Sequence, residues 1–446
     1  MAVPNDLTPT SLVTAEQDAI ELLRQLIRLD STNTGQPDST KGEAEVAEFV
    51  EAALQEVGYT PERFETTGAT RQGVHLHIPG ADSSRGGLLL HGHLDVVAAI
   101  EEEWSVPPFA AEEIDGLIWG RGAVDMKDMD AMILATVRHW ARTGYVPPRD
   151  ITLLFTPDEE AGGLHGAHWI VDNRPELLMG VTEAVGEVGG YSMTINDDLR
   201  LYLIQTAEKG LSWLQLRANG KVGHGSMLND ANAVTRLADA VSRLGNHRFP
   251  VALTPTTQGF LDELAEAIDS PVDPHDTERF LQVLGPLARV IGATMSNTVQ
   301  PTMLSAGHKV NVIPGQAVAH VDGRFLPGHE EEFMAQVDQL LGDEVLREYV
   351  HHDIALETSF DGPTIDAMSS ALRAEDPGAR AVPYMLSGGT DAKSWSLLGI
   401  RCYGFAPLKL PPELDFGSMF HGVDERVPVD GVKFGVRVLN RFLAGA

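Results

Sequence analysis

Histidine and carboxylate side chains follow apolar segments at several places in the chain. His93 and Asp95 close the run Leu-Leu-Leu-His-Gly-His-Leu-Asp, and because they are two residues apart they face the same way on a strand. One of the two can bind a metal ion while the other orients a ligand. Alone, the pattern is weak, since an isolated histidine in this position is more often structural.

A second group of carboxylates follows the apolar segment 151–156. Asp158, Glu159 and Glu160 are consecutive, and glycines follow at 162 and 163. Adjacent carboxylates at a strand end repel one another unless a cation binds them. One carboxylate can then bind a metal while its neighbour accepts a proton from water. The alternative, an exposed acidic turn, fits less well with the apolar strand that precedes the group.

Three further candidates are spread along the chain. Asp125 stands before a helical segment, Glu187 ends an apolar segment, and His421 lies near the C-terminus. Asp125 alone is also a good helix cap. The glycines at 120 and 122 resemble part of a dinucleotide-binding turn, but no buried strand precedes them in the required register.

Taken together, these residues indicate a metal site. Carboxylate oxygens with imidazole nitrogens suit zinc, cobalt or manganese. Five ligands exceed one tetrahedral site, so two ions that share one carboxylate are the simplest arrangement. The set consists of His93, Asp125, Glu160, Glu187 and His421.

The elements that must position these side chains alternate between strand and helix. Apolar periodicity predicts helices over 14–29, 42–57 and 126–143, and strands over 73–78, 87–97 and 151–156. This order predicts an α/β fold with a mixed, largely parallel sheet and helices on both faces. In such sheets, ligands bind at the carboxyl ends of the strands, where the candidate residues lie.

The middle of the chain has a different pattern. Strands are predicted over 213–218, 318–325 and 345–355, with helices over 232–244 and 331–341, while 250–274 reads as loop with some helix. This order predicts a small ferredoxin-like α+β domain inserted into the larger one. We therefore expect a catalytic domain made of residues 1–210 and 359–446, and an inserted domain of residues 211–358. The apolar segment 400–405 should return to the first sheet.

Composition excludes several classes of protein. The 446 residues are 43% hydrophobic and 22% charged, as in ordinary globular proteins, and the net charge of -31 disfavours binding to nucleic acid. The single cysteine, Cys402, excludes an intrachain disulfide and is expected to be buried in a strand. We see no signal peptide in Met1–Asp6 and no membrane span, which predicts a cytoplasmic protein without a membrane partner.

At this level of detail the chain resembles the M20 family of co-catalytic metallopeptidases, which includes glutamate carboxypeptidases, aminoacylases and succinyl-diaminopimelate desuccinylases. The resemblance covers nearly the whole chain. It rests on short motifs that occur in the family's order: 92–96 (GHLDV), 120–127 (GRGAVDMK), 159–163 (EEAGG), 208–210 (EKG), 223–226 (GHGS), 311–314 (NVIP), 387–391 (SGGTD) and 421–422 (HG).

The resemblance implies a role for each candidate. Asp125 would bridge two divalent ions, expected to be zinc, with cobalt or manganese as alternatives. His93 and Glu187 would complete one site, and Glu160 and His421 the other. Asp95 would orient His93, and Glu159 would be the general base for a water activated by the two ions.

The inserted domain resembles the family's lid, which often also forms a dimer contact, so we expect a homodimer. There His224 would stabilise the tetrahedral oxyanion, commonly from the partner subunit. Asn311 and Arg324 would bind substrate, Arg324 by a forked grip on a carboxylate, although a surface ion pair is the alternative for this residue. Gly388, Gly389 and Thr390 would offer further donors to the same end of the substrate.

The function expected from this resemblance is hydrolysis of an amide or peptide bond in a small carboxylate-bearing substrate, either a dipeptide or an N-acyl amino acid. Within that class, peptidase, N-acyl-amino-acid deacylase and desuccinylase stay open. A catalytically inactive binding or scaffold protein on the same fold is the alternative from another class. A serine hydrolase is excluded, because no Gly-x-Ser-x-Gly turn follows a strand.

Overall fold

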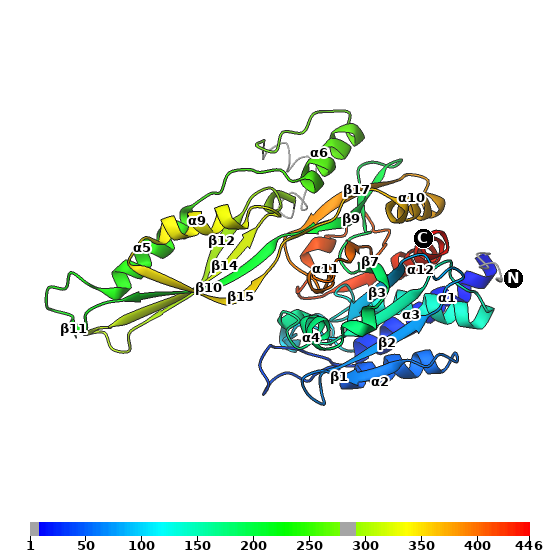
Figure 1. Cartoon of the computed structure of the whole chain (residues 1–446), viewed down its shortest axis with the longest axis horizontal. Coiled ribbons are helices and arrows are strands. Elements are labelled where there is room, and N and C mark those ends of the chain that lie inside the picture. The colour runs from blue at the N-terminus through cyan, green and yellow to red at the C-terminus, as the bar shows by residue number, and fades with distance from the viewer. Residues whose placement is uncertain (1–8, 277–290) are drawn as a thin grey trace.

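A ten-stranded mixed sheet forms the body of the protein, and a four-stranded sheet projects from it (Figure 1). The computed structural model describes residues 9–276 and 291–446. The expectation made for Met1–Asp6, that this segment is no signal peptide, concerns residues outside the described ranges. No helix in the described ranges combines the length and the apolar character that crossing a bilayer requires.

The centre of the body sheet consists of four parallel neighbours: β6 (Ile151–Thr156), β3 (Gly87–His93), β7 (Val181–Gly186) and β18 (Arg401–Gly404). Antiparallel pairs add β2 (Gln72–Ile78) and β1 (Glu62–Glu65) beside β6. On the other side lie β9 (Arg200–Glu208), β8 (Ser192–Thr194), β16 (Leu356–Glu357) and β17 (Ala379–Leu386). The largely parallel sheet predicted from the sequence is confirmed, and segment 400–405 returns to it as β18.

Helices cover both faces of this sheet. Leu88 and Leu90 of β3 pack in one apolar cluster with residues of α1 (Pro9–Arg28), α2 (Ala44–Gln55), α3 (Lys127–Thr143), α10 (Pro363–Glu375) and α12 (Val429–Gly445). Leu89, which points the other way, packs with residues of α4 (Ala167–Asn173) and α11 (Ala392–Ser396). Cys402 lies in this second cluster, buried and unpaired as expected.

A small three-stranded sheet connects two distant parts of the chain. It contains β4 (Glu112–Ile114), β5 (Leu117–Trp119) and β19 (Arg426–Pro428), which pairs with β5. The segment after β5 leads to Asp125, and the segment before β19 contains His421. This sheet therefore holds the two loops side by side.

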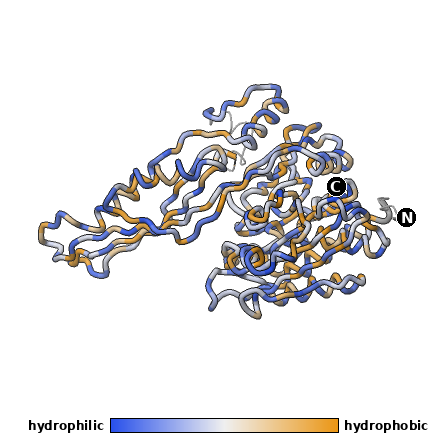
Figure 2. Tube along the Cα trace, in the orientation of Figure 1, coloured by the Kyte–Doolittle hydropathy of each residue, from blue (hydrophilic) through white to orange (hydrophobic). Residues whose placement is uncertain are grey.

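The projecting sheet, which we call the outer sheet, is antiparallel in the order β12 (Thr298–Ala306), β14 (Gln316–Phe325), β10 (Gly210–Asn219) and β15 (Val345–Asp353). Helices α5 (Ala233–Asn246) and α9 (Glu330–Leu341) lie on it and share its apolar cluster. Buried and more exposed residues alternate along β14, and hydrophobic and hydrophilic segments alternate along this arm in Figure 2. At the far end, β11 (Gly223–His224) pairs with β13 (Val312–Ile313).

One residue separates the outer sheet from the body sheet. β9 ends at Glu208 and β10 begins at Gly210, so Lys209 is the joint. Its buried ammonium donates to the carbonyl oxygens of Ala293 and Ser296 and to the hydroxyl of Thr298, at 3.0, 2.8 and 3.1 Å. A Cβ on Gly210 would stand 2.0 Å from the ring of Phe325, so the joint is tightly packed.

The structure corrects one sequence expectation, sharpens a second and adds a strand that was not expected. The strand expected over 87–97 ends at His93, and Asp95 lies in the loop beyond it. The stretch 250–274 contains a full helix, α6 (Pro255–Ala267), which begins with a Thr254 cap and a proline in its first turn. Strand β12 was not predicted, because Pro301 interrupts it and most of its side chains are exposed.

Candidate active site

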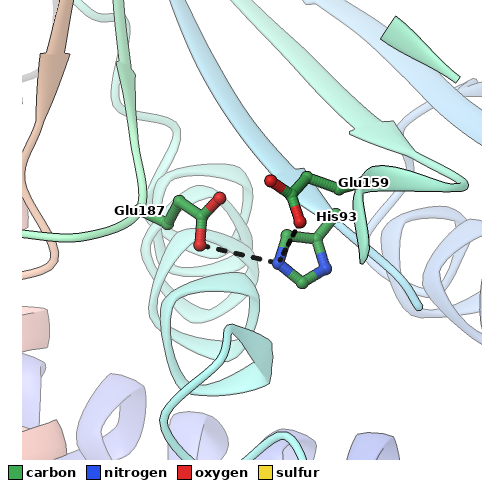
Figure 3. Close-up of side chains that lie close together, drawn as sticks. All are labelled: His93, Glu159 and Glu187. Carbon is green, nitrogen blue, oxygen red and sulfur yellow. Dashed lines mark ion pairs between the residues drawn. The ribbon is translucent and has the colours of Figure 1, made fainter. Parts of the chain in front are cut away.

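Polar residues converge at the carboxyl ends of the parallel strands. His93 is the last residue of β3, Glu159 and Glu160 form a 3-10 turn after β6, and Glu187 follows β7. Figure 3 shows the carboxylates of Glu159 and Glu187 pointing towards the His93 ring from neighbouring strand ends. The parallel strands therefore gather residues that are up to 94 positions apart, the interval from 93 to 187.

Asp125 lies at the centre of the group, directly before α3. Its Oδ1 is 3.1 Å from His93 Nε2, and its Oδ2 is 3.3 Å from His421 Nε2. Glu187 Oε2 lies 3.5 Å from the same nitrogen of His93, and Glu160 Oε2 lies 2.9 Å from that of His421. The five residues thus form two sets that meet at the two oxygens of one carboxylate.

Negative charge exceeds positive charge in this group. Within the described residues, every ion pair of Asp125, Glu159, Glu160 and Glu187 is with His93 or His421. Burial raises the pKa of Glu187 to about 8 and also raises the pKa of Glu159, where the charge of Glu187 adds to the effect. Buried carboxylates of this kind favour the binding of a proton or a cation.

The pKa values of the two histidines are raised as well, because the neighbouring carboxylates favour the protonated imidazoles. Hydrogen bonds to Asp125 and Glu160 raise the pKa of His421 to about 10. Burial lowers the pKa of His93, but the charge of Glu187 and the hydrogen bond to Asp125 outweigh it and raise the value well above normal. Burial also acts to raise the pKa of Asp125, yet its bonds to both histidines hold it below its ordinary value.

The donor set fits divalent metal ions. His93, Glu159 and Glu187 place ligand atoms within 4.8 Å of one another, and so do His93, Asp125 and Glu160. Imidazole nitrogens and carboxylate oxygens are the ligands that zinc, cobalt and manganese share. A cation would also relieve the excess of buried negative charge.

Asp95 also contacts the turn that carries Glu159 and Glu160, which its spacing from His93 did not predict. The Nδ1 atom of His93 lies 3.0 Å from the backbone oxygen of Asp95 and 3.6 Å from its carboxylate. The carboxylate instead accepts from the backbone N–H groups of Glu159 and Glu160, both at 3.1 Å, and from Asn33 at 2.8 Å. Asp95 therefore fixes the turn that carries both glutamates, while its backbone oxygen is in reach of His93.

A cavity of about 210 Å³ opens beside the cluster, between the body and the outer sheet. Glu159, Glu160 and His421 line it. Arg324 of β14 and the buried Lys393 of α11 line it as well. Arg324 Nε is 2.7 Å from Asp322 Oδ1, so the guanidinium is already in an ion pair, although it still borders the cavity.

The glycine-rich segment after β17 forms the floor between the cluster and this cavity. Gly388, Gly389 and Thr390 all line it. The hydroxyl of Thr390 donates to Glu208 Oε1 at 2.6 Å, and its backbone N–H donates to Oε2 at 3.0 Å. These two Thr390 donors are engaged with Glu208, so the glycines are the better placed of the three to meet a substrate.

Two predicted site residues lie far from the cluster within one chain. His224 belongs to β11, and Asn311 accepts a hydrogen bond from Gly225 beside it, at 2.9 Å. Figure 1 shows β11 at the outer end of the arm, while β3 and β7 lie in the body. A single chain therefore does not bring His224 or Asn311 to His93.

Several supporting residues were not identified from the sequence. Asn33 bonds Asp95 and Asp158, and Arg71 pairs with Asp158 at 2.9 Å, which holds the left-handed turn before Glu159. Lys393 and His168 line the cavity. Asn33 and Arg71 lie outside the motifs and far from the ligands in sequence, so only the fold shows that they belong here.

The sequence matches a known family and several curated relatives. The model of peptidase family M20/M25/M40 matches residues 89–445. N-fatty-acyl-amino acid synthase/hydrolase PM20D1 from Homo sapiens is 30% identical over 389 residues, which cover 83% of this chain and 76% of that protein. Aminoacylase-1 from Homo sapiens is 28% identical over 436 residues, 96% of this chain and 95% of that protein.

Solved structures show the same fold. The M20 family metallo-carboxypeptidase Sso-CP2 from Sulfolobus solfataricus superposes with a TM-score of 0.72 at 18% identity, over 96% of this chain and 99% of the other. Human carnosine dipeptidase 1 gives a TM-score of 0.69 at 15% identity, over 98% and 97%. With the family match across most of the sequence, the chain belongs to peptidase family M20/M25/M40 and is a hydrolase of that metal-dependent family.

Proposed function

We propose that this protein hydrolyses the amide or peptide bond of a small carboxylate-bearing substrate, a dipeptide or an N-acyl amino acid, with two divalent metal ions. The observation that supports this best is the division of the ligands around Asp125, one oxygen facing His93 and the other His421. Glu187 would complete the first site and Glu160 the second. We expect zinc, with cobalt or manganese as substitutes.

Each protein group has a distinct part in the reaction. Bound at these residues, the ions would polarise the substrate carbonyl and lower the pKa of the attacking water. Glu159, whose Oε2 lies 3.9 Å from His93 Nε2, borders the cavity and would accept the proton of that water. Its raised pKa then lets the carboxyl group pass this proton to the nitrogen of the leaving amine. Asp95 keeps Glu159 in place through the backbone.

The substrate carboxylate would bind in the cavity that contains Arg324 and Lys393. Arg324 would exchange part of its pairing with Asp322 for a forked contact with the substrate. Gly388 and Gly389 line the same cavity, and Gly389 lies against the side chain of Lys393. Their backbone N–H groups would add donors near these positive side chains.

We further propose that residues 211–358 act as a lid and dimerisation domain on a catalytic domain of residues 1–210 and 359–446. His224 is exposed and remote from its own cluster, which is the arrangement expected of a residue that serves the partner's site. There it would stabilise the oxyanion, and Asn311 beside it would contact the substrate. A homodimer would thus complete each site.

Replacement of Glu159 by glutamine tests the mechanism. Glu159→Gln should retain bound metal, measured by elemental analysis, and lose at least roughly a thousandfold in kcat on dipeptide and acyl-amino-acid substrates. Glu176→Gln, an exposed glutamate that pairs with Arg174, is the matched control and should retain full kcat. Near-normal turnover by Glu159→Gln would reject its role as the base.

The alternative of an inactive binding protein on this fold makes a different prediction. Such a protein would turn over none of these substrates with zinc, cobalt or manganese present, although it would still bind them. The complete set of candidate ligands and the general base disfavours it. A screen of dipeptides, N-acetyl and N-succinyl amino acids with each metal separates the two possibilities.

A further inference from the structure

A second cavity, of about 290 Å³, adjoins the first on the other side of the metal-ligand cluster. The two share Glu159, His421 and the glycines at 388 and 389. A substrate whose scissile bond lies over the cluster would therefore extend into both cavities. The residues that line the second cavity then determine which acyl groups the substrate can carry.

The wall of this second cavity is apolar and firmly packed. Apart from the cluster residues, the glycines and Ser387, it is formed by Val188, Tyr191, Tyr384, Leu386 and Phe420. Tyr191 and Tyr384 are nearly buried, with rings 6.5 Å apart and edge to face. Tyr191 also packs on Phe416 at 5.0 Å, which packs on Phe420 at 5.5 Å. A continuous aromatic row thus leads up to the loop of His421.

The two cavities differ in charge. Arg324 and Lys393 line the first cavity, and no lysine or arginine lines the second among the described residues. The acidic and imidazole groups of the second are the cluster residues Asp125, Glu159, Glu187 and His421. Burial raises the pKa of the Tyr191 and Tyr384 phenols, so both stay neutral at pH 7. A negatively charged acyl group placed there would be desolvated without a permanent cation to pair with.

We propose that the second cavity is the acyl subsite and that it selects uncharged, apolar acyl groups, aliphatic or aromatic, over charged ones such as succinyl. The inference rests on the proposed hydrolysis of acyl amino acids and names the class of acyl group within it. The amino-acid carboxylate then lies in the first cavity, near Arg324. This orientation disfavours a desuccinylase.

A series of substrates with one amino acid and varied acyl groups tests the subsite. With the metal-loaded full chain, kcat/KM should rise about threefold to fourfold for each methylene from acetyl to hexanoyl, until the cavity is filled. Pentanoyl should exceed succinyl, which is of similar length, by at least a hundredfold. Equal rates for the two, or no dependence on length, would overturn the subsite while leaving the hydrolase function intact. Hydrolysis of none would instead reject the proposed function.

Substitutions at Leu386, which lines the second cavity, test whether the acyl preference arises there. Leu386→Lys should lower the preference for pentanoyl over succinyl at least tenfold, because it supplies the missing cation. Leu397→Lys adds the same charge at an exposed position of the body and should leave the preference unchanged. Leu386→Trp keeps the site apolar and fills it, so hexanoyl should lose far more than acetyl. An unchanged profile for both Leu386 variants would contradict the assignment.

A second inference concerns the buried carboxylate of Glu425, four residues after His421. Its Oε1 accepts from the backbone N–H groups of Val124 and Asp125, at 2.6 and 3.1 Å. Its Oε2 accepts from Gly122 N–H at 3.1 Å and from Arg121 Nη1 at 2.7 Å. The other guanidinium nitrogen of Arg121 donates to the carbonyl of Gly422, at 2.9 Å.

These contacts bind the Asp125 loop and the His421 loop to each other through one ion pair. Glu425 and Arg121 are both nearly inaccessible to solvent, and neither is a candidate ligand. We infer that Glu425 is a positioning residue that sets the separation of Asp125 and His421, and thereby the metal affinity of the site that they share. This inference needs no assumption about the substrate.

Metal affinity measures this role directly. Glu425→Gln cannot accept hydrogen bonds at both of its terminal atoms, so zinc affinity, from competition with a chromophoric chelator, should fall roughly tenfold to a hundredfold. Glu183→Gln is the matched control, because it also breaks a buried ion pair, the one with Arg149. Glu183 lies near the start of β7, whereas the candidate ligand Glu187 follows the end of that strand. Glu183→Gln should lower the unfolding temperature without changing zinc affinity. Unchanged zinc affinity in a folded Glu425→Gln protein would overturn the inference.

Discussion

At the scale of single residues, the site brings four carboxylates together with only two imidazoles. Asp125, Glu159, Glu160 and Glu187 face two imidazoles, and Asp125 and Glu187 are buried. Burial raises the pKa of Glu187, and hydrogen bonds to Asp125 and Glu160 raise the pKa of His421. In the metal-free protein, Glu187 and His421 therefore hold protons that bound metal ions would displace.

Metal binding should therefore release protons. At pH 7 the metal-free protein keeps a proton on Glu187, whose pKa is about 8, and on His421, whose pKa is about 10. Both must be lost before these groups bind metal, so zinc affinity should rise between pH 6 and pH 8. Calorimetric titration in buffers of different ionisation enthalpy measures the protons released. An affinity that does not change with pH would contradict this account.

The sequence predicts the candidate metal ligands better than it predicts the residues that position them. His93, Glu160 and Glu187 stand directly at strand ends, where the fold class alone brings side chains together. Asp95 was assigned to a strand beside His93, yet its carboxylate contacts the Glu159 turn, because the strand ends two residues earlier. Its hydrogen bonds depend on loop geometry, which residue spacing does not encode.

At the scale of elements, the helices and strands whose side chains are buried are the ones that the sequence predicts best. The strand predicted over 151–156 is β6, residue for residue, since all six side chains are buried and Asp150 and Pro157 flank the segment. The helix predicted from Asn232 begins one residue later, with Asn232 as its cap. Strand β12 was missed for the opposite reason, because its order comes from pairing with β14 and not from its own side chains.

A buried ion pair between elements should be visible in the acid stability of the protein. Asp376 bonds Arg200 and Tyr202 of β9 from the turn before β17. Burial raises its pKa, but these partners and Lys409 outweigh burial and lower the value to about 2. The stabilisation is therefore complete above about pH 4 and is lost as the pH falls towards 2.

Asp376→Asn should consequently lower the unfolding temperature at pH 6, and the difference from the unmodified protein should shrink as the pH approaches 2. Thermal unfolding followed by circular dichroism at several pH values measures this convergence. Asp38→Asn removes an exposed aspartate in a turn outside the helices and serves as the control, with no expected shift at any pH. A constant difference between Asp376→Asn and the unmodified protein would reject the linkage.

At the scale of the whole molecule, the proposed site residues lie partly in the body and partly at the far end of the arm. The body supplies His93, Asp125 and Glu159, and the arm holds His224 where its own cluster is out of reach. We proposed above that two copies complete each other. The proposal can be tested without any structure of the dimer.

Mixing two inactive variants should restore activity if His224 acts on the partner's site. A dimer of one His224→Ala chain and one Glu159→Gln chain contains one site with both residues intact. Random exchange in an equal mixture makes half of the dimers mixed, so activity should recover to about a quarter of normal. Each variant alone should stay inactive. No recovery after verified exchange, or a fully active monomer, would reject the shared site.

The joint at Lys209 has a mechanical consequence. β10 begins there and spans ten residues, roughly 33 Å at about 3.3 Å per residue, before the chain reaches His224. A rotation of about 10° at the joint would therefore swing the tip through about 6 Å, several times the displacement that breaks a hydrogen bond. The backbone oxygen of Lys209 accepts a hydrogen bond from Lys393, which lines the first cavity, so the arm pivots close to that cavity. A change of packing around Lys209, too small to disturb the body, would shift His224 relative to the partner's site at which we propose that it acts.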